Sequence, residues 1–314
     1  MIPPWIFAAG LVVVVLGAAY GVRNQVDTML APAFGLGSGK PKLWWYVDDS
    51  QANTKQWVSF EDRATRDPND PFLVLCLLRA RQLWSQEFDI TPVIGRKAAL
   101  CLLTSKEPEG VAKCPPALWM AWCQSAFLKE HGGLWLDGSV LPIGSGTDLL
   151  RRLSGNTVLT FGSDPDEELV VVGQGAPAAG RSAGWAAVPG HPMWLGLERD
   201  LSDIIALGPQ SWSAFEARRS LRFLWDKHCS GVTAVDRKAE VSRDRFGRRI
   251  DYEDLFGTTE WQDGSTEGGL WVPLPLGRDG LERASAWLWF TRMSEQQILD
   301  SDFFWARLAS RHLQ

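Results

Sequence analysis

Several widespread functional signatures are absent from this sequence. The 314 residues include 32 Lys and Arg against 37 Asp and Glu, a net charge of −5 at pH 7. The excess of positive charge that nucleic-acid-binding proteins usually carry is missing, so no nucleic-acid partner is expected. The chain also has neither a Walker A pattern nor a His-Glu-x-x-His zinc pattern. These absences exclude the P-loop nucleotidases and zinc peptidases that such motifs identify.

Cysteine is scarce, with five residues and no Cys-x-x-Cys spacing. Cys76, Cys101 and Cys123 each lie in an apolar segment, as buried free thiols do. The sequence therefore predicts neither a disulfide framework nor structural zinc.

Apolar and aromatic residues are plentiful by contrast. Hydrophobic residues make up 45% of the chain and charged residues 22%, which is typical of a globular protein with one large α/β domain or two smaller ones. Seventeen residues are Trp, and most of them occur in apolar runs. We expect most to be core residues, while a few could stack on sugar rings.

The amino-terminal segment contains one long uncharged run, Trp5–Val22, of 18 residues. As a helix it would extend about 27 Å, enough to cross the hydrocarbon core of a membrane. We predict a single-pass membrane anchor in residues 1–23; a cleaved signal peptide is the alternative, although no Lys or Arg precedes the run. Arg23 weakly favours a cytoplasmic domain, and the side of the membrane stays open.

Residues 24–39 form a Gly-rich stretch that predicts a flexible stalk. The folded domain is expected to occupy residues 40–314.

Residues 126–146 carry the strongest functional pattern. A predicted helix, Ala117–Glu130, ends before the pair Gly132 and Gly133, and a short apolar strand then leads to Asp137 and Gly138. A buried strand that ends on Asp-Gly leaves its carboxylate at the sheet edge, where open α/β sheets bind ligands. Asp137 is therefore a candidate ligand for a metal or a substrate.

The run Lys-Glu-His-Gly-Gly-Leu-Trp-Leu-Asp-Gly-Ser-Val at 129–140 resembles the signature of nucleotide-sugar glycosyltransferases of the DXD-containing and capsular-polysaccharide-synthesis type. Supporting similarities are a predicted first strand within Lys40–Asp49, a helix at Phe72–Gln82, a second strand at Phe88–Ile94, and Pro-Gly-His-Pro within Ala187–Trp194. The resemblance covers about residues 40–200.

This resemblance implies an α/β domain with a three-layer GT-A-like fold and a mostly parallel sheet. It also implies transfer of a sugar from a nucleoside-diphosphate sugar to a glycan or other acceptor, with retention of configuration. Asp137 would hold a divalent metal, Mn²⁺ or Mg²⁺, that neutralises the leaving diphosphate. The implied donor-binding residues are Gly132, Gly133, Trp135, Asp137, Ser139 and Trp45, and His191 is a candidate on the acceptor side, with a structural role in its turn as the alternative.

Three positions depart from the family pattern. Ala121 and Gln124 occupy the positions where relatives usually carry Asp and Arg, and Ser139 replaces a second acidic residue. These differences support an alternative, a non-catalytic binding or scaffold module tethered to a membrane.

Other segments give weaker expectations. Asp48 and Asp49 follow the first predicted strand, where a solvated turn is favoured over a ligand role. The sequence further predicts strands at Thr157–Phe161 and Leu169–Val172. The basic segment Arg237–Arg249 is expected to be a solvated loop, and its functional alternative is contact with lipid headgroups or a diphosphate. A carboxyl-terminal helix is expected to begin at Ser294, which Gln297 would help to cap.

Overall fold

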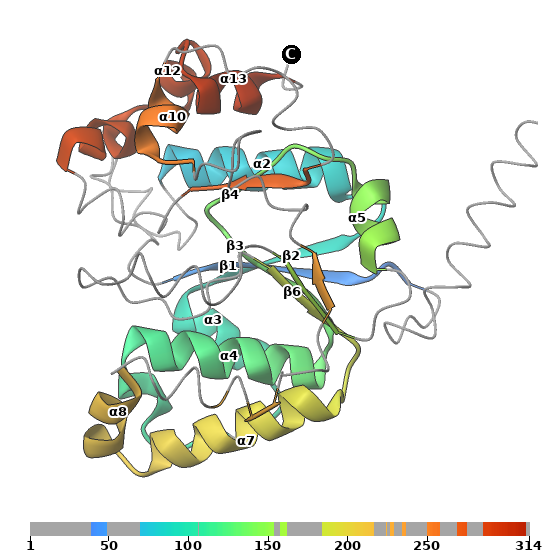
Figure 1. Cartoon of the computed structure of the whole chain (residues 1–314), viewed down its shortest axis with the longest axis vertical. Helices are drawn as coiled ribbons and strands as arrows, with labels where there is room; N and C mark the ends of the chain where they lie inside the picture. The colour runs from blue at the N-terminus through green and yellow to red at the C-terminus, as the bar shows by residue number, and fades with distance from the viewer. Residues whose placement is uncertain are drawn as a thin grey trace, which may run out of the picture.

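The computed structural model (Figure 1) describes residues 39–48, 70–105, 107–153, 158–161, 184–216, 224, 227–228, 234–236, 250–257, 269–274 and 285–311. The predicted anchor at 5–22 and the predicted stalk up to residue 38 lie outside these residues. The predicted strand at 169–172 and the basic segment at 237–249 lie outside them too. No helix within the described residues is both long and apolar enough to cross a membrane.

The described residues form a central six-stranded sheet with the strand order β2-β1-β3-β6-β5-β7. Strands β2, β1 and β3 are mutually parallel, β6 is antiparallel to both of its neighbours, and β5 and β7 are parallel. Parallel pairings thus outnumber antiparallel ones, as expected, although the reversed strand β6 was not predicted. The strands are β1 (Lys42–Val47), β2 (Asp89–Ile94), β3 (Gly133–Asp137), β5 (Val158–Phe161), β6 (Gly184–Ala187) and β7 (Ala234–Asp236).

Helices cover both faces of this sheet (Figure 1). On one face lies α2 (Pro71–Trp84), which connects the parallel strands β1 and β2. The other face carries α3 (Gly95–Leu102), α4 (Pro116–Glu130) and α7 (Pro192–Ala206), followed by the short α8 (Pro209–Glu216). The helices predicted at 72–82 and 117–130 are confirmed, with Pro at the first turn of each, where its missing N–H leaves no helical hydrogen bond unmade.

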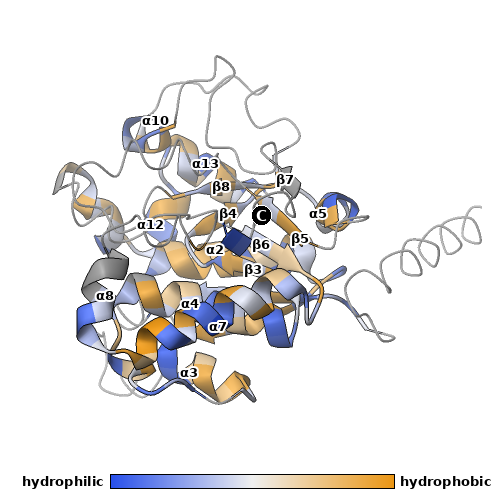
Figure 2. Cartoon of the chain, turned by 60° about the horizontal axis from the view of Figure 1, so that its bottom comes forward, coloured by the Kyte–Doolittle hydropathy of each residue, from blue (hydrophilic) through white to orange (hydrophobic). Residues whose placement is uncertain are grey.

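The sheet separates two hydrophobic cores, because alternate residues of each strand point to its opposite faces. In β1, Leu43, Trp45 and Val47 pack toward α2, whereas Trp44 and Tyr46 pack toward α4. Each central strand is therefore apolar on both faces, which is why these strands read as continuous apolar runs. Figure 2 shows α4 and α7 packed side by side, with mixed polar and apolar stretches along α7.

A second layer of structure covers α2 (Figure 1). It contains a two-stranded sheet, β4 (Val140–Pro142) paired with β8 (Trp271–Pro273), and the carboxyl-terminal elements. The carboxyl-terminal elements are α10 (Tyr252–Phe256), the 3₁₀ segment η5 (Ser285–Arg292), α12 (Glu295–Leu299) and α13 (Phe304–Ser310). From the middle of the chain, α5 (Gly146–Leu153) also packs against α2, and the 3₁₀ turn η2 (Val111–Lys113) lies with the core of α4 on the opposite face of the sheet. Ser294 and Gln297 form the reciprocal capping box that the sequence predicts at the start of α12.

Candidate functional site

Asp137 is the last residue of β3 and lies at the carboxyl end of the parallel strands. Its oxygen Oδ1 accepts two hydrogen bonds from Ser139, one from the backbone N–H at 2.8 Å and one from the hydroxyl at 2.6 Å. The other oxygen, Oδ2, accepts no hydrogen bond from any described residue. Ser139, itself buried, therefore fixes the orientation of the carboxylate and leaves one oxygen for a ligand.

Asp48 follows the neighbouring strand β1 at the same edge of the sheet. Tyr46, which pairs with Asp137 across the two strands, donates a hydrogen bond from its hydroxyl to Asp48 Oδ2 at 3.1 Å and accepts one from Trp119 Nε1 at 2.8 Å. Burial, and next the charge of Asp48, raise the pKa of Tyr46 well above its usual value, so the phenol keeps its proton. Two carboxylates from adjacent strands thus lie at one edge of the sheet, where the sequence favours a solvated turn over a ligand role for Asp48.

Trp45 and Cys76 lie beneath this edge, on the side of α2. Trp45 is fully buried, and its indole Nε1 has no hydrogen-bond partner among the described residues. A Cβ added to Gly138 would lie 3.1 Å from this nitrogen. Burial, with a further contribution from the charge of Asp137, raises the pKa of the Cys76 thiol well above its usual value. Both side chains belong to the core that supports the turn after β3.

Gly132 and Gly133 lie at the amino end of β3, about 13 Å from Asp137 along the strand. Both have positive φ, at 62° and 89°. A Cβ at Gly132 would lie 2.5 Å from Pro189 Cδ, and one at Gly133 would lie 2.5 Å from the carbonyl oxygen of Lys42. The close packing and the left-handed end of α4 explain both glycines, so the structure gives no support to their predicted role in donor binding.

Trp135 lies within the core rather than in a site. Its ring stacks on Tyr46 at 5.0 Å between centroids and contacts the edge of Phe127 at 5.1 Å, and the residue is only 4% exposed. The structure therefore assigns this predicted donor residue to packing between β3 and α4.

His191 lies on the opposite edge of the sheet from Asp137. It follows β6, whose Ala187 pairs with Gly133 at the amino end of β3. The imidazole caps α7, because Nδ1 accepts a hydrogen bond from the backbone N–H of Met193 at 3.3 Å, and burial lowers its pKa. The structural role is thus the one that the geometry supports, and His191 does not share a site with Asp137.

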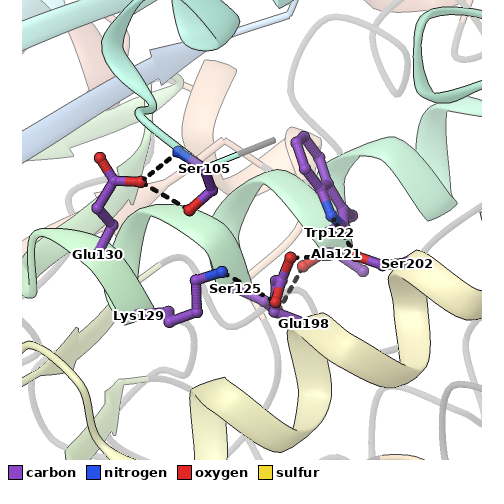
Figure 3. Close-up of polar contacts among 8 residues, drawn as sticks. All are labelled: Ser105, Ala121, Trp122, Ser125, Lys129, Glu130, Glu198 and Ser202. Carbon is purple, nitrogen blue, oxygen red and sulfur yellow. Dashed lines mark hydrogen bonds and ion pairs between the residues drawn. The ribbon is translucent and has the colours of Figure 1, made fainter. Parts of the chain in front are cut away.

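Ala121 and Gln124 lie on α4. The carbonyl of Ala121 accepts a hydrogen bond from Ser125, beside the interface of α4 with α7 (Figure 3). Gln124 is half-buried and makes no side-chain hydrogen bond to a described residue. Neither residue supplies a charge, so α4 has no equivalent at these positions of the Asp and Arg that the resemblance implies.

The polar contacts of α4 serve the fold instead (Figure 3). Lys129 pairs with Glu198 of α7 at 2.9 Å, Glu198 accepts a hydrogen bond from Ser202, and Ser202 accepts one from Trp122. Glu130 accepts hydrogen bonds from the loop after α3. These contacts fix the position of α4 relative to α7 and α3, and hence of the strand that carries Asp137.

A metal ion could be held here only in part by the protein. The described residues contain no group of three or more His, Cys, Asp or Glu side chains that could hold one. Mg²⁺ and similar hard cations are commonly bound by one or two carboxylates, with waters and substrate phosphates as further ligands. Asp137 Oδ2 could serve as one such carboxylate ligand, and phosphate oxygens of a substrate would then complete the coordination of the metal ion.

Comparison with known proteins identifies no family. No protein-family model matches the chain, and no curated protein shows a significant match. Several solved chains match, and among them is a glycosyltransferase involved in the glycosylation of the major capsid of PBCV-1, in a match that covers 81% of this chain and 100% of that chain. Its sequence identity is 11% and the TM-score is 0.40, so this likeness supports no conclusion about mechanism or substrate.

Proposed function

We propose that this chain is a glycosyltransferase that binds a nucleoside-diphosphate sugar at the carboxyl edge of β1 and β3. The observation that carries the proposal is the carboxylate of Asp137, which Ser139 holds through one oxygen while the other accepts no hydrogen bond from the described residues. In open α/β sheets this edge is where ligands bind. The resemblance of residues 129–140 to the glycosyltransferase signature supports the same substrate class.

Asp137 would hold a divalent metal, Mn²⁺ or Mg²⁺, and the diphosphate would supply further ligands. When bound, such an ion neutralises charge on the leaving nucleoside diphosphate. Ser139 would keep the carboxylate in one orientation, which its buried hydroxyl and backbone N–H already do.

The reaction is tested with purified protein and a panel of nucleoside-diphosphate sugars. Release of nucleoside diphosphate is measured with Mn²⁺, with Mg²⁺ and with a chelator. We expect metal-dependent release with one donor, its loss in Asp137→Asn, and its retention in Asp302→Asn, which changes an exposed carboxylate on another surface. Equal release by the wild type and by Asp137→Asn would refute the role of Asp137.

We also propose that the transferred sugar retains its anomeric configuration, and the support for this is the resemblance of residues 129–140 to the DXD-type families. The anomeric configuration of the first product, followed by nuclear magnetic resonance, decides it. An inverted product would separate this chain from the DXD-type families.

A non-catalytic binding or scaffold module is the second candidate. It is favoured by Ala121 and Gln124, which supply no charge, and by the packing roles of Gly132, Gly133 and Trp135. This module would fold normally and have no affinity for nucleotides. Metal-dependent hydrolysis of any donor would rule it out.

Both candidate functions, the glycosyltransferase and the non-catalytic module, include a membrane anchor formed by residues 5–22. It rests on the uncharged run at the amino terminus. The full chain should remain with membranes after alkaline extraction, and a chain that lacks residues 1–23 should not. Release of both by the same treatment would refute the anchor.

A further inference from the structure

Trp289 is the one exposed tryptophan among the described residues. It lies in η5 and is 40% exposed, whereas most of the other described tryptophans are buried in the two cores. Trp287, two residues earlier in η5, is partly exposed, and the ring centroids of the two tryptophans lie 6.2 Å apart. Neither indole N–H donates a hydrogen bond to a described residue. Two neighbouring aromatic side chains therefore reach the surface with N–H donors that no described residue uses.

A layer of buried rings holds this exposed pair in place. Trp289 contacts Phe256 and Phe303 at 5.7 Å and 5.8 Å between ring centroids, with its plane inclined to theirs by 63° and 74°. Trp287 contacts Phe256 at 5.4 Å. Both phenylalanines are buried. Edge-to-face packing of this kind fixes the orientation of a ring without hydrogen bonds, so the exposed parts of the two tryptophans are pre-organised for a ligand.

The pair lies toward the edge of the sheet that carries Asp137. Helix α2 connects the parallel strands β1 and β2, so it runs back antiparallel to them and its first turn lies at their carboxyl ends. Phe72, in that first turn, contacts Phe290 of η5 at 5.6 Å. Phe290 directly follows Trp289, in the layer that covers α2 (Figure 1). A ligand on the two tryptophans would thus lie toward the end of the strands where the donor is proposed to bind.

The charges around the pair favour a neutral polar ligand. At α10, η5 and α12 the exposed charged residues are four carboxylates and one guanidinium, from Asp251, Glu253, Glu295, Asp300 and Arg292. Such a surface repels anionic lipid headgroups and polyphosphates. Carboxylates also accept hydrogen bonds, which the hydroxyl groups of a sugar can donate.

The size of the aromatic pair argues against a protein partner. Two tryptophan side chains bury at most about 500 Å² when they are fully covered. Each side of a stable protein interface buries roughly 800 Å². The pair therefore suits a ligand of a few sugar rings better than a second protein surface.

We propose that Trp287 and Trp289 bind a neutral oligosaccharide, the glycan acceptor of the proposed transferase. An aromatic face offers an apolar surface that suits the C–H face of a sugar ring, and the indole N–H groups can donate to its hydroxyl oxygens. The identity of this ligand as the acceptor rests on the proposed function, whereas its binding to the two tryptophans is measurable without any donor. The acceptor side is then formed by η5 and not by His191, which caps α7 at the opposite edge of the sheet.

Calorimetry of the purified full chain tests the binding, with neutral tetrasaccharides of glucose, galactose, mannose and xylose as probes and without donor or metal. We expect one of them to bind the wild type. Trp289→Leu keeps an apolar side chain against Phe256 and Phe303 but removes the aromatic face, so the dissociation constant should increase at least about fivefold. Leu207→Ala, the control, changes an exposed apolar residue at the end of α7 and should bind the probe as the wild type does.

Trp287→Leu tests the second ring, and it keeps the test decisive should Trp289→Leu fail to fold. Its dissociation constant for the same tetrasaccharide should also increase at least about fivefold. Equal affinity in the wild type and in the folded tryptophan variants, or no binding of any of the four probes by the wild type, would overturn the proposal.

Failure of this proposal can be told apart from failure of the proposed function. Asp137→Asn should lose the metal-dependent release of nucleoside diphosphate but bind the tetrasaccharide as the wild type does. Binding that depends on Trp289, in a chain that releases nucleoside diphosphate from no donor, would support the sugar-binding surface and refute the transferase. Release of nucleoside diphosphate by a chain that binds none of the four probes would support the transferase and overturn the sugar-binding surface.

Discussion

Gly133 offers the sharpest test of how β3 is built into the sheet. Its φ is 89°, and a Cβ at this position would lie 2.5 Å from the carbonyl oxygen of Lys42, on the neighbouring strand β1. Gly133→Ala would therefore combine an unfavourable backbone conformation with a collision against a backbone atom that cannot rotate away.

The magnitude follows from the two contributions. A left-handed conformation costs an alanine about 1–2 kcal/mol. Overpacking against a fixed neighbour adds about 1–3 kcal/mol. We therefore expect Gly133→Ala to lower the free energy of unfolding by about 2–5 kcal/mol, and the Tm by about 3–8 °C for a chain of this length.

Gly190→Ala is the matched control. Gly190 has a similar φ of 71°, but nothing lies within 4 Å of the position of a Cβ. Only the backbone contribution applies there, so a loss of about 1–2 kcal/mol is expected. Urea unfolding of both variants measures the difference. Equal losses in the two variants would refute the steric argument for Gly133 and, with it, the close packing of β3 on β1.

Three further substitutions test separate parts of the structure. Ser139→Ala removes the hydroxyl that donates to Asp137, so metal-dependent nucleotide binding, measured by calorimetry, should weaken about threefold to tenfold, and an unchanged affinity would contradict the orienting role. In Glu130, burial alone would raise the pKa, but hydrogen bonds from Thr104 and Ser105 outweigh it and lower the pKa to about 2 from the usual 4.5. The ionised Glu130 carboxylate therefore stabilises the fold fully above pH 4.5, and this stabilisation is lost as the pH falls through 2. The unfolding free energies of the wild type and Glu130→Gln should differ at pH 7 and converge near pH 2. A difference that stays constant with pH would refute the role of these hydrogen bonds. Lys129→Met leaves Glu198 without its ion pair but with its bond from Ser202, so urea unfolding should show a loss of about 1–3 kcal/mol, and no loss would show that the ion pair contributes nothing.

Local patterns in the sequence predicted most of the elements around the site. The apolar runs predicted β1, β2, β3 and β5, and helical spacing predicted α2 and α4. The Asp-Gly turn after an apolar strand correctly indicated a carboxylate at the carboxyl edge of the sheet. These signals succeed because each depends on a few neighbouring residues.

The arrangement of the site could not be predicted in the same way. Strand β6 runs antiparallel to β3, and this pairing carries His191 to the amino edge, away from Asp137. Strand pairing depends on contacts between distant segments, which local periodicity does not record. The close packing of Gly132 on Pro189 and of Gly133 on Lys42 depends on distant segments in the same way, so the sequence pattern of the two glycines did not reveal it.

The burial of Arg79 on α2 was also not predicted, although the sequence contains a signal for it. It falls among the apolar positions of α2 at helical spacing from Phe72, Leu75 and Cys76, where a charge is unusual. A charged residue on the apolar face of a predicted helix is therefore worth examining for a buried ionic role.

Nucleotide binding tests the central claim most directly. The Tm of the purified chain is measured with a panel of nucleoside diphosphates, with and without Mn²⁺, for the wild type, Asp137→Asn and Asp302→Asn. A ligand that binds only the folded state raises the Tm. The glycosyltransferase proposal predicts a rise with one nucleotide that requires Mn²⁺, is lost in Asp137→Asn and is retained in Asp302→Asn. No rise with any nucleotide, or a rise that Asp137→Asn retains in full, would contradict it.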